Sequence, residues 1–246
     1  MKILGIDIGG SGIKGAPVDL ASGALADERY RITTPQPATP QAVAKTVGKL
    51  VRHFKWQGPV GCGFPAVVQN GVVRTAANIH SNWVGCTVEK LLREATGCPV
   101  SVINDADAAG MAEVRFGLGQ DHPGVVLMVT IGTGIGSALF VNGRLVPNTE
   151  LGHLFLKDEG IAEDYAADSV RKKKDLSWKK WAKRFNVYLA EVEKLFWPDM
   201  IVLGGGISKR FDNYAKYLKS EAPVKPAALL NEAGIIGAAL AVQDVG

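Results

Sequence analysis

The chain has 246 residues, of which 47% are hydrophobic and 21% are charged. This composition is ordinary for a folded globular protein and excludes a disordered or low-complexity chain. No run approaches the roughly 20 apolar residues of a membrane span, and the first residues lack the apolar segment of a secretory signal, so we expect a cytoplasmic protein with no membrane partner. The three cysteines are far apart in the sequence, which argues against a disulfide framework.

The net charge of +4 is unevenly distributed along the chain. Residues 171–184 hold eight cations and one acid, a formal charge of +7, which leaves −3 for the rest of the chain. A basic cluster on an otherwise mildly acidic protein indicates an anionic partner.

The first part of the chain predicts a glycine-rich hairpin followed by alternating strands and helices. Residues 3–8 form an apolar run, residues 9–12 a glycine turn and residues 13–20 a returning strand. The other elements expected in this part are strands over 25–34, 60–68, 72–76 and 100–103 and helices over 41–54, 88–95 and 106–116.

A second cycle of the same pattern begins near residue 125. A strand over 125–131, a glycine turn over 132–136 and a strand over 137–141 repeat the first hairpin about 120 residues later. We therefore expect two related α/β halves. The remaining predicted elements are helices over 161–174, 178–196, 210–220 and 231–242 and a strand over 200–203.

Glycine turns at the ends of three predicted strands are candidate phosphate sites, because glycine lets backbone N–H groups approach a phosphate without a Cβ in the way. Each turn taken alone is equally well a plain tight turn. The sequence has neither a Walker loop nor a G-x-G-x-x-G fingerprint, which disfavours P-loop and dinucleotide-binding folds. The candidate phosphate or nucleotide contacts are Asp7, Gly9, Gly10, Ser11, Gly12, Lys14, Thr130, Gly132, Thr133, Gly134, Gly204, Gly205 and Gly206.

The order of these motifs resembles the ROK group of sugar kinases and repressors, within the actin and hexokinase superfamily. The resemblance runs from about residue 3 to residue 242. More narrowly, the chain resembles the polyphosphate glucokinase and polyphosphate/ATP glucomannokinase branch of that group. The segments that carry the narrower resemblance are GIDIGGSGIKG, GFPAVV, TAAN, NDADAAGMAE, TIGTGIGSALF, LVPNTELGH, LSWKKWAKR and GGGISK.

The resemblance implies a fold of two actin-like, ribonuclease H-like α/β domains flanking a central cleft. We expect residues 1–112, with the C-terminal helix 231–246, to form a small domain that carries the first phosphate hairpin and the catalytic aspartate. Residues 113–230 would form a large domain with the second phosphate loop, the sugar-binding motif and the basic segment. Relatives in the family are commonly dimers, so a homodimer is expected.

The implied activity is phosphorylation of glucose, and also of mannose, at the 6-hydroxyl, with inorganic polyphosphate, ATP or both as donor and Mg²⁺ as cofactor. Such a reaction needs a base for the attacking hydroxyl, and Asp105 is the candidate. An Asp in this position is also a good N-cap for the helix that follows, and both roles are compatible. Asp7 would bind Mg²⁺ through water.

Sugar contacts are implied by the Glu-x-Gly-His motif and by a second glutamate further along the chain. Many ROK proteins carry a cysteine-rich zinc site between these two, but residues 154–162 contain no cysteine, so we expect no zinc. Repressors of the group carry an amino-terminal DNA-binding domain, and because the hairpin begins at residue 3 we expect none here. The expected substrate-binding residues are Asn78, Asn104, Asp105, Glu150, His153 and Glu163.

The basic segment overlaps the helix predicted over residues 178–196, whose apolar residues fall on one stripe. The cations fall on the opposite face, which a generic helix would simply expose to solvent. Ser177 is a plausible N-cap, which puts cations in the first turns, where the helix dipole disfavours them and an anion would be attracted. The candidate polyphosphate track comprises Arg171, Lys172, Lys173, Lys174, Lys179, Lys180, Lys183 and Arg184.

Three alternatives remain open at this level. One is an ATP-only ROK hexokinase for another sugar, and a second is a sugar sensor that keeps the pocket without the chemistry. The sensor would be expected to lose Asp7 or Asp105, and both are present. The third, a nucleic-acid binder using the basic segment, has no recognition motif to support it, so no nucleic-acid partner is expected.

Overall fold

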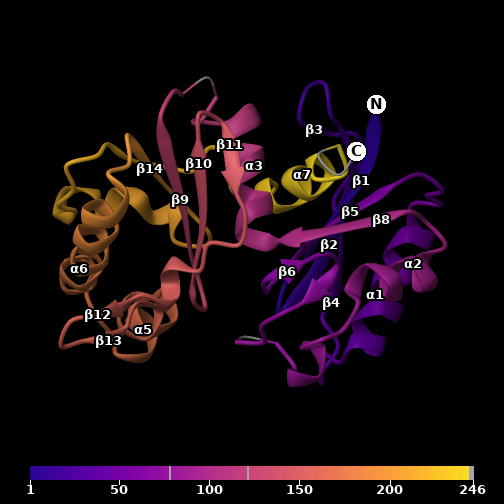
Figure 1. Cartoon of the computed structure of the whole chain (residues 1–246), viewed down its shortest axis with the longest axis horizontal. Coiled ribbons are helices and arrows are strands. Elements are labelled where there is room, and N and C mark those ends of the chain that lie inside the picture. The colour runs from indigo at the N-terminus through magenta and orange to yellow at the C-terminus, as the bar shows by residue number, and fades with distance from the viewer. Residues whose placement is uncertain (78, 121, 244–246) are drawn as a thin grey trace. The chain divides into compact units, whose positions relative to one another are not determined.

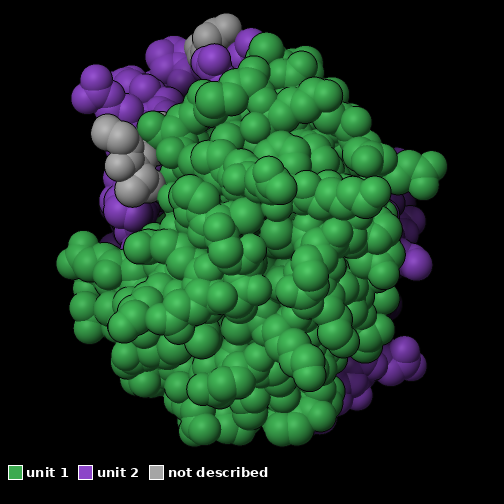
Figure 2. Space-filling view, turned by 90° about the vertical axis from the view of Figure 1, so that its right-hand side faces the viewer, with its two compact units in different colours: residues 1–112, 232–246 green, residues 113–231 purple. Residues whose placement is uncertain are grey.

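The structure is a computed structural model that describes residues 1–77, 79–120 and 122–243. The chain forms two compact units, coloured separately in Figure 2. Unit 1 comprises residues 1–112 and 232–246, and unit 2 comprises residues 113–231. Among the described residues, no helix is both long and apolar enough to cross a membrane.

Unit 1 is built on a mixed sheet in the order β3-β2-β1-β5-β8, with β4 also paired to β2. The hairpin β1–β2 is antiparallel, whereas β1, β5 and β8 run parallel, so the carboxyl ends of these three strands meet at one edge. The strands are β1 (Lys2–Ile8), β2 (Gly12–Asp19), β3 (Ala24–Leu25), β4 (Tyr30–Thr33), β5 (Val60–Phe64) and β8 (Val100–Asn104), with the small ribbon β6 (Val68–Gln69) and β7 (Val72–Val73) beside them. The helices are α1 (Pro40–His53), η1 (Ser81–Trp83), α2 (Val88–Thr96) and α7 (Ala233–Leu240), and α3 (Asp105–Phe116) begins in unit 1 and ends in unit 2.

Helix α7 packs directly onto the backbone of the unit 1 sheet and lies along β1 in Figure 1. Gly5 of β1 and Gly61 of β5 are paired neighbours and together leave a flat patch on the sheet. A Cβ on Gly5 would lie 2.0 Å from the carbonyl oxygen of Ile235, and one on Gly61 would lie 1.7 Å from that of Ala238. The C-terminal helix can approach this closely only because both strand positions are glycine. The other face of the same strands packs its apolar residues against α1.

Unit 2 repeats this plan with a sheet in the order β11-β10-β9-β14-β15. An antiparallel hairpin, β9–β10, is again extended by parallel strands, with β14 paired to β9 and β15 paired to β14. The strands of this sheet are β9 (Val125–Ile131), β10 (Ile135–Val141), β11 (Arg144–Val146), β14 (Met200–Gly204) and β15 (Val224–Pro226). The other elements are η2 (Leu151–His153), β12 (Phe155–Leu156), β13 (Gly160–Ile161), α4 (Ala162–Ala166), α5 (Asp168–Lys173), α6 (Trp178–Phe196), η3 (Ser208–Asn213) and η4 (Ala215–Tyr217).

Helix α6 spans the residues that the sequence predicts and supplies much of the unit 2 core. Ser177 caps it, because its hydroxyl accepts a hydrogen bond from the backbone N–H of Lys180. The stripe from Trp181 to Val192 is buried against β9 and β14. The indole N–H of Trp181 donates to the carbonyl of Ala166 at 2.8 Å, so this tryptophan is a core residue.

Several predicted elements are wrong in detail. The strand expected over 60–68 is divided into β5 and β6, and the strand expected over 72–76 ends at Val73 as β7. The helix expected over 210–220 is instead a pair of 3₁₀ turns, η3 and η4, and Arg210 inside η3 has φ −119°. Asp212-Asn213 favours turns over helix, and Phe211, Tyr214 and Tyr217 recur every third residue, as in a 3₁₀ helix. The helix expected over 161–174 breaks at Ala167, which is extended, and the strand expected over 25–34 is split into β3 and β4.

Candidate active site

The first glycine turn closes the hairpin β1–β2 in unit 1. The N–H of Gly9 donates to the carbonyl of Gly12 at 3.1 Å, and the hydroxyl of Thr34 donates to the carbonyl of Gly9 at 2.5 Å. Asp7 and Lys14 lie directly opposite each other at the base of the turn, and their side chains form an ion pair of 2.7 Å. The turn therefore has a fixed shape, and an acidic and a basic side chain lie where the two strands enter and leave it.

The second glycine turn, in unit 2, is built in the same way. The N–H of Gly132 donates to the carbonyl of Gly134 at 3.0 Å, and Thr130 takes the position on β9 that Asp7 takes on β1. Ser169 at the start of α5 holds this turn through two bonds, its N–H to the carbonyl of Gly132 and its hydroxyl to that of Thr133. The basic segment begins two residues after this serine.

The third glycine turn follows β14. Gly205 has φ +76°, and a Cβ there would lie 2.6 Å from the carbonyl oxygen of Ile131 on the neighbouring strand. Gly204 is paired with Thr130, so this turn and the second one share an edge of the unit 2 sheet. The chain continues into the short turn η3 rather than a full helix.

Asp105 is the first residue of α3 and follows directly from β8. The capping role that the sequence leaves open for Asp105 belongs to its neighbour Asn104, whose amide oxygen accepts from the N–H groups of Ala106 and Asp107 at 2.8 and 3.2 Å. The Asn104 amide group also donates to the carbonyl of Ala66. Asn104 is thus buried and committed to holding the start of the helix, and a direct contact of Asn104 with sugar stays a prediction.

Asp7 and Asp105 stand at the same edge of the unit 1 sheet. Asp7 is paired with Gly63 on β5, and the α-carbon of Asp105 lies 3.6 Å from where a Cβ on Gly63 would be. Gly234, at the start of α7, packs against the Asp7 carboxyl, since a Cβ there would come within 3.1 Å of its Cγ. Gly63 and Gly234 were missed by the sequence reasoning, because their role depends on close packing that only the fold reveals.

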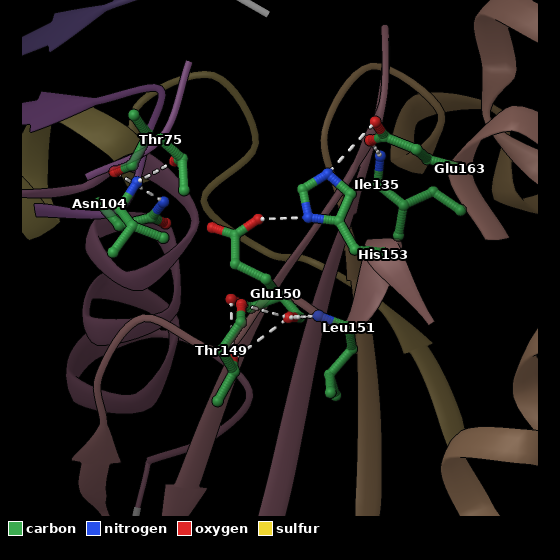
Figure 3. Close-up of polar contacts among 11 residues, drawn as sticks. Thr75, Asn104, Ile135, Thr149, Glu150, Leu151, His153 and Glu163 are labelled. Atoms are coloured by element: carbon green, nitrogen blue, oxygen red, sulfur yellow. Dashed lines mark hydrogen bonds and ion pairs between the residues drawn. The ribbon is translucent and has the colours of Figure 1, made fainter. Parts of the chain in front are cut away.

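Glu150, His153 and Glu163 come together in unit 2. Figure 3 shows the His153 ring between the two carboxylates, with Nδ1 3.4 Å from Glu150 and Nε2 3.5 Å from Glu163. Glu163 also accepts a hydrogen bond of 3.2 Å from the N–H of Ile135, where β10 leaves the second glycine turn. The group is therefore tied to the same strand that carries the candidate phosphate loop.

The loop that carries Glu150 is held by Ser137, a second residue that the sequence reasoning missed. The hydroxyl of Ser137 donates to the carbonyl of Thr149 at 2.7 Å and accepts from the N–H of Leu151 at 3.0 Å. A serine between a glycine-rich loop and an apolar run is the sequence signal that would have found it, because a polar side chain in a buried strand needs a hydrogen-bond partner. Burial raises the pKa of the Glu150 carboxyl, the charge of His153 lowers it and that of Glu163 raises it, with a net upward shift.

Some cations of the basic segment are already paired with other groups of the protein. Arg171 and Lys172 both bind the carboxylate of Asp168 at 2.7 Å, and Arg184 donates to the carbonyl of Tyr165. Burial acts to raise the pKa of Asp168, but the hydrogen bonds from Lys172 and Arg171 outweigh it, and the pKa is lowered. The exposed lysines of the segment for which no ion pair with a described residue is seen are Lys173, Lys174, Lys179, Lys180 and Lys183.

The site residues thus form two groups, one in each unit. The first lies at one end of the unit 1 sheet and the second around the corresponding end of the unit 2 sheet. Asn78, the remaining sugar-contact prediction, lies outside the described residues. Among the residues that the structure describes, no group of three or more His, Cys, Asp or Glu side chains is arranged to hold a metal ion.

Comparison with known proteins identifies the family. The model of the ROK family matches residues 3–163. Polyphosphate glucokinase of Mycobacterium tuberculosis strain H37Rv is 51% identical over 238 residues, which cover 96% of this chain and 89% of that protein. The crystal structure of inorganic polyphosphate/ATP-glucomannokinase from Arthrobacter sp. strain KM has a TM-score of 0.96 at 47% identity and covers 100% of this chain and 99% of that one.

A more distant structure extends the likeness in fold. A ROK family glucokinase from Streptomyces griseus, solved with glucose and AMPPNP, has a TM-score of 0.85 at 24% identity, covering 99% of this chain and 100% of that one. The expected actin-like fold of two α/β domains is confirmed by these neighbours. The chain belongs to the ROK family.

Proposed function

We propose that this chain is a glucokinase that phosphorylates glucose, and also mannose, at the 6-hydroxyl, with inorganic polyphosphate or ATP as donor and Mg²⁺ as cofactor. The observation that carries the proposal is Asp105, presented at the start of α3 by the cap that Asn104 provides and on the same sheet edge as Asp7. The names of the similar proteins, a polyphosphate glucokinase and a polyphosphate/ATP-glucomannokinase, support the choice of sugar and donor.

Asp105 acts as the general base. It accepts the proton of the sugar 6-hydroxyl while that oxygen bonds to the terminal phosphorus of the donor. The bond from this phosphorus to its bridging oxygen breaks, and the shortened donor leaves with the electron pair. The helix amino terminus beside Asp105 favours an ionised carboxylate before the reaction.

Glu150 and Glu163 accept hydrogen bonds from sugar hydroxyls that do not react, and His153 between them donates one. A pocket that hydrogen-bonds hydroxyls discriminates strongly against sugars that lack them, because its own polar groups are then left unpaired. Each ring nitrogen of His153 faces one of the two carboxylates, so the ring is oriented between the residues that accept from the sugar.

Mg²⁺ in phosphoryl transfer is usually held by one or two carboxylates, by water and by the phosphates of the donor, and it spreads the charge that develops on them. Asp7 fits such a site: it is the carboxylate at the foot of the first glycine turn, and its ion pair with Lys14 keeps it oriented. A contact to the metal through water is compatible with that ion pair.

The basic segment serves as a track for polyphosphate. Support comes from its attachment to the second glycine turn through Ser169, so that a phosphate chain leaving this turn meets cations immediately. The exposed lysines at the start of α6 also lie where a helix amino terminus attracts anions.

The direct test is an assay of the purified protein with glucose, Mg²⁺ and either ATP or polyphosphate, with mannose as second acceptor. Formation of hexose 6-phosphate from both donors is expected. Activity with ATP alone would identify an ATP-only hexokinase, and glucose binding without turnover would identify a sensor.

Three further expectations belong to this proposal. We also expect a cytoplasmic location and a homodimer. The homodimer follows from the resemblance, and light scattering on the purified protein tests it. Because the loop before Glu163 lacks cysteine, metal analysis is expected to find no stoichiometric zinc. One tightly held zinc per chain would contradict that expectation.

A further inference from the structure

A row of three charged side chains crosses unit 1 beside the first glycine turn. Asp7 of β1 lies opposite Lys14 of β2, and Lys14 lies opposite Arg31 of β4. Residues directly opposite each other in antiparallel strands send their side chains to the same face of the sheet. The three charged groups therefore share one face, at the end of the strands that carries the turn.

The charges in this row do not cancel. Asp7 and Lys14 neutralise each other through their 2.7 Å ion pair. Arg31 is exposed. Its guanidinium donates a hydrogen bond of 2.8 Å to the carbonyl of Ser11, which is a neutral acceptor. The row as a whole keeps one positive charge beside the turn.

The guanidinium of Arg31 lies over the turn itself. A Cβ on Gly12 would come within 2.4 Å of its Nε and 2.7 Å of its Cζ, so the planar group covers the position that only glycine leaves open. A guanidinium has five N–H donors, and the bond to Ser11 uses one of them. No bond from the remaining donors to another described residue is seen, and they lie beside backbone that the function proposed above assigns to phosphate binding.

Two like charges directly opposite each other in a sheet destabilise the pairing of their strands. Lys14 and Arg31 are such a pair. A bound anion would offset the charge of Arg31, which the ion pair of Asp7 with Lys14 leaves uncompensated. The planar fork of arginine matches the oxygens of a phosphate particularly well.

We propose that Arg31 binds a phosphate group of the phosphoryl donor at the first glycine turn. The proposal rests on the assignment of this turn to the donor in the proposed function, and it adds a residue to which no role has been given. The competing explanation is that Arg31 only braces the turn through Ser11.

The test compares Arg31→Gln and Arg31→Lys with a matched control, Arg29→Gln. Arg29 is exposed, precedes β4 and undergoes the same change of charge. We expect Arg31→Gln to raise the KM for ATP and polyphosphate roughly ten- to hundred-fold, with the KM for glucose within about twofold of wild type. Arg31→Lys should recover part of the loss, and Arg29→Gln should change neither constant.

Calorimetric titration with tripolyphosphate, without glucose, separates this proposal from the activity itself. If the wild type binds tripolyphosphate and Arg31→Gln binds it at least about tenfold more weakly, the phosphate contact is supported even where no turnover is seen. Two results would overturn the proposal and leave Arg31 with only the role of bracing the turn. One is equal affinity of the folded wild type and folded Arg31→Gln for tripolyphosphate, and the other is an equal rise in the KM for donor and for glucose together with a lowered thermal midpoint. Recovery of donor KM in Arg31→Lys without recovery of the thermal midpoint would support it.

Discussion

Asp105 is where the proposed chemistry can be tested most sharply at the scale of one residue. Asp105→Asn keeps the shape of the side chain and leaves the Asn104 cap in place, while it removes the base. We expect kcat to fall by roughly 10²- to 10⁴-fold, because general-base catalysis contributes about that much. The glucose Kd, measured by calorimetry, should change little. Turnover close to that of the wild type would rule out Asp105 as the base.

Glu150 provides a prediction about pH. Because burial raises its pKa in the folded protein, the folded state holds this proton more tightly than the unfolded state does. The stability of the wild type should therefore fall relative to Glu150→Gln as pH rises from about 4, the ordinary carboxyl range, through the raised pKa. Thermal midpoints of both proteins, measured between about pH 4 and pH 7, test this. A difference that does not change with pH, or that favours the wild type at higher pH, would contradict it.

The sequence was sufficient to place Asp105 between a strand and a helix but not to divide the roles of Asn104 and Asp105 there. The pattern of a short apolar strand, then Asn104-Asp105, then a helix can be recognised in the sequence. It does not say which of the two residues is the cap, because Asn and Asp cap helices about equally well. Only the structure shows that Asn104 is the cap. Arg31 was missed for a related reason: its position opposite Lys14 depends on how residues 20–29 return the chain to β2, and no local pattern records that register.

At the scale of elements, α3 carries a buried carboxylate that links distant parts of unit 2. Glu113 is 1% exposed and accepts hydrogen bonds from the N–H groups of Leu118, Ala228 and Leu229 at 3.4, 3.1 and 2.7 Å. Glu113→Ala leaves these donors without an acceptor, and we expect a loss of about 2–4 kcal/mol in the free energy of unfolding. Glu113→Gln keeps an acceptor and should lose less.

Urea denaturation followed by tryptophan fluorescence measures this effect. Glu191→Ala is a suitable control, because Glu191 lies on α6 in the same unit and its side chain makes, among the described residues, one long contact of 3.7 Å to Lys194. Its exposed pair should contribute less than about 1 kcal/mol. Equal midpoints for Glu113→Ala and the control would show that the Glu113 carboxylate does not hold the segment that follows β15.

Elements with strong local signals were predicted well. The cap at Ser177 and the apolar stripe fixed both ends of α6, and the glycine turns fixed both hairpins. The path of segment 208–217 was not predicted, because it is decided by tertiary contacts rather than by helix propensity. Tyr214 packs against Trp178 and Trp181, and Phe211 packs against Tyr214. The break between α4 and α5 at Ala167 was not predicted either, because no glycine or proline marks it in the sequence.

At the scale of the whole molecule, the repetition of one hairpin predicted two related halves, and the sheets of the two units have matching order. The packing of α7 on Gly5 and Gly61 could not be predicted in the same way. It depends on two glycines 56 residues apart becoming neighbours on adjacent strands. The distribution of charge, in contrast, follows directly from the sequence: residues 171–184 carry a formal charge of +7 and the rest of the chain carries −3.

That imbalance leads to a test of the donor. Lys172 is unsuitable for it, because its loss would also break the ion pair with Asp168 that helps to hold α5. Four exposed lysines that make no such pair with a described residue are changed to Gln together: Lys173, Lys174, Lys180 and Lys183. The control changes four exposed lysines of unit 1 and so alters the net charge equally: Lys2, Lys45, Lys49 and Lys90.

The track variant should raise the KM for long-chain polyphosphate much more than the KM for ATP. A long phosphate chain contacts cations beyond the reacting group, whereas ATP ends near the glycine turns. By analogy with the release of counterions from nucleic acids, polyphosphate use by the wild type should fall steeply with salt, and the track variant should show a flatter dependence. The control should keep the wild-type slope, because charge elsewhere on the chain does not touch the polymer. If the track variant affects both donors equally, or neither, the basic segment is an ordinary solvated surface and the phosphate chain follows another path.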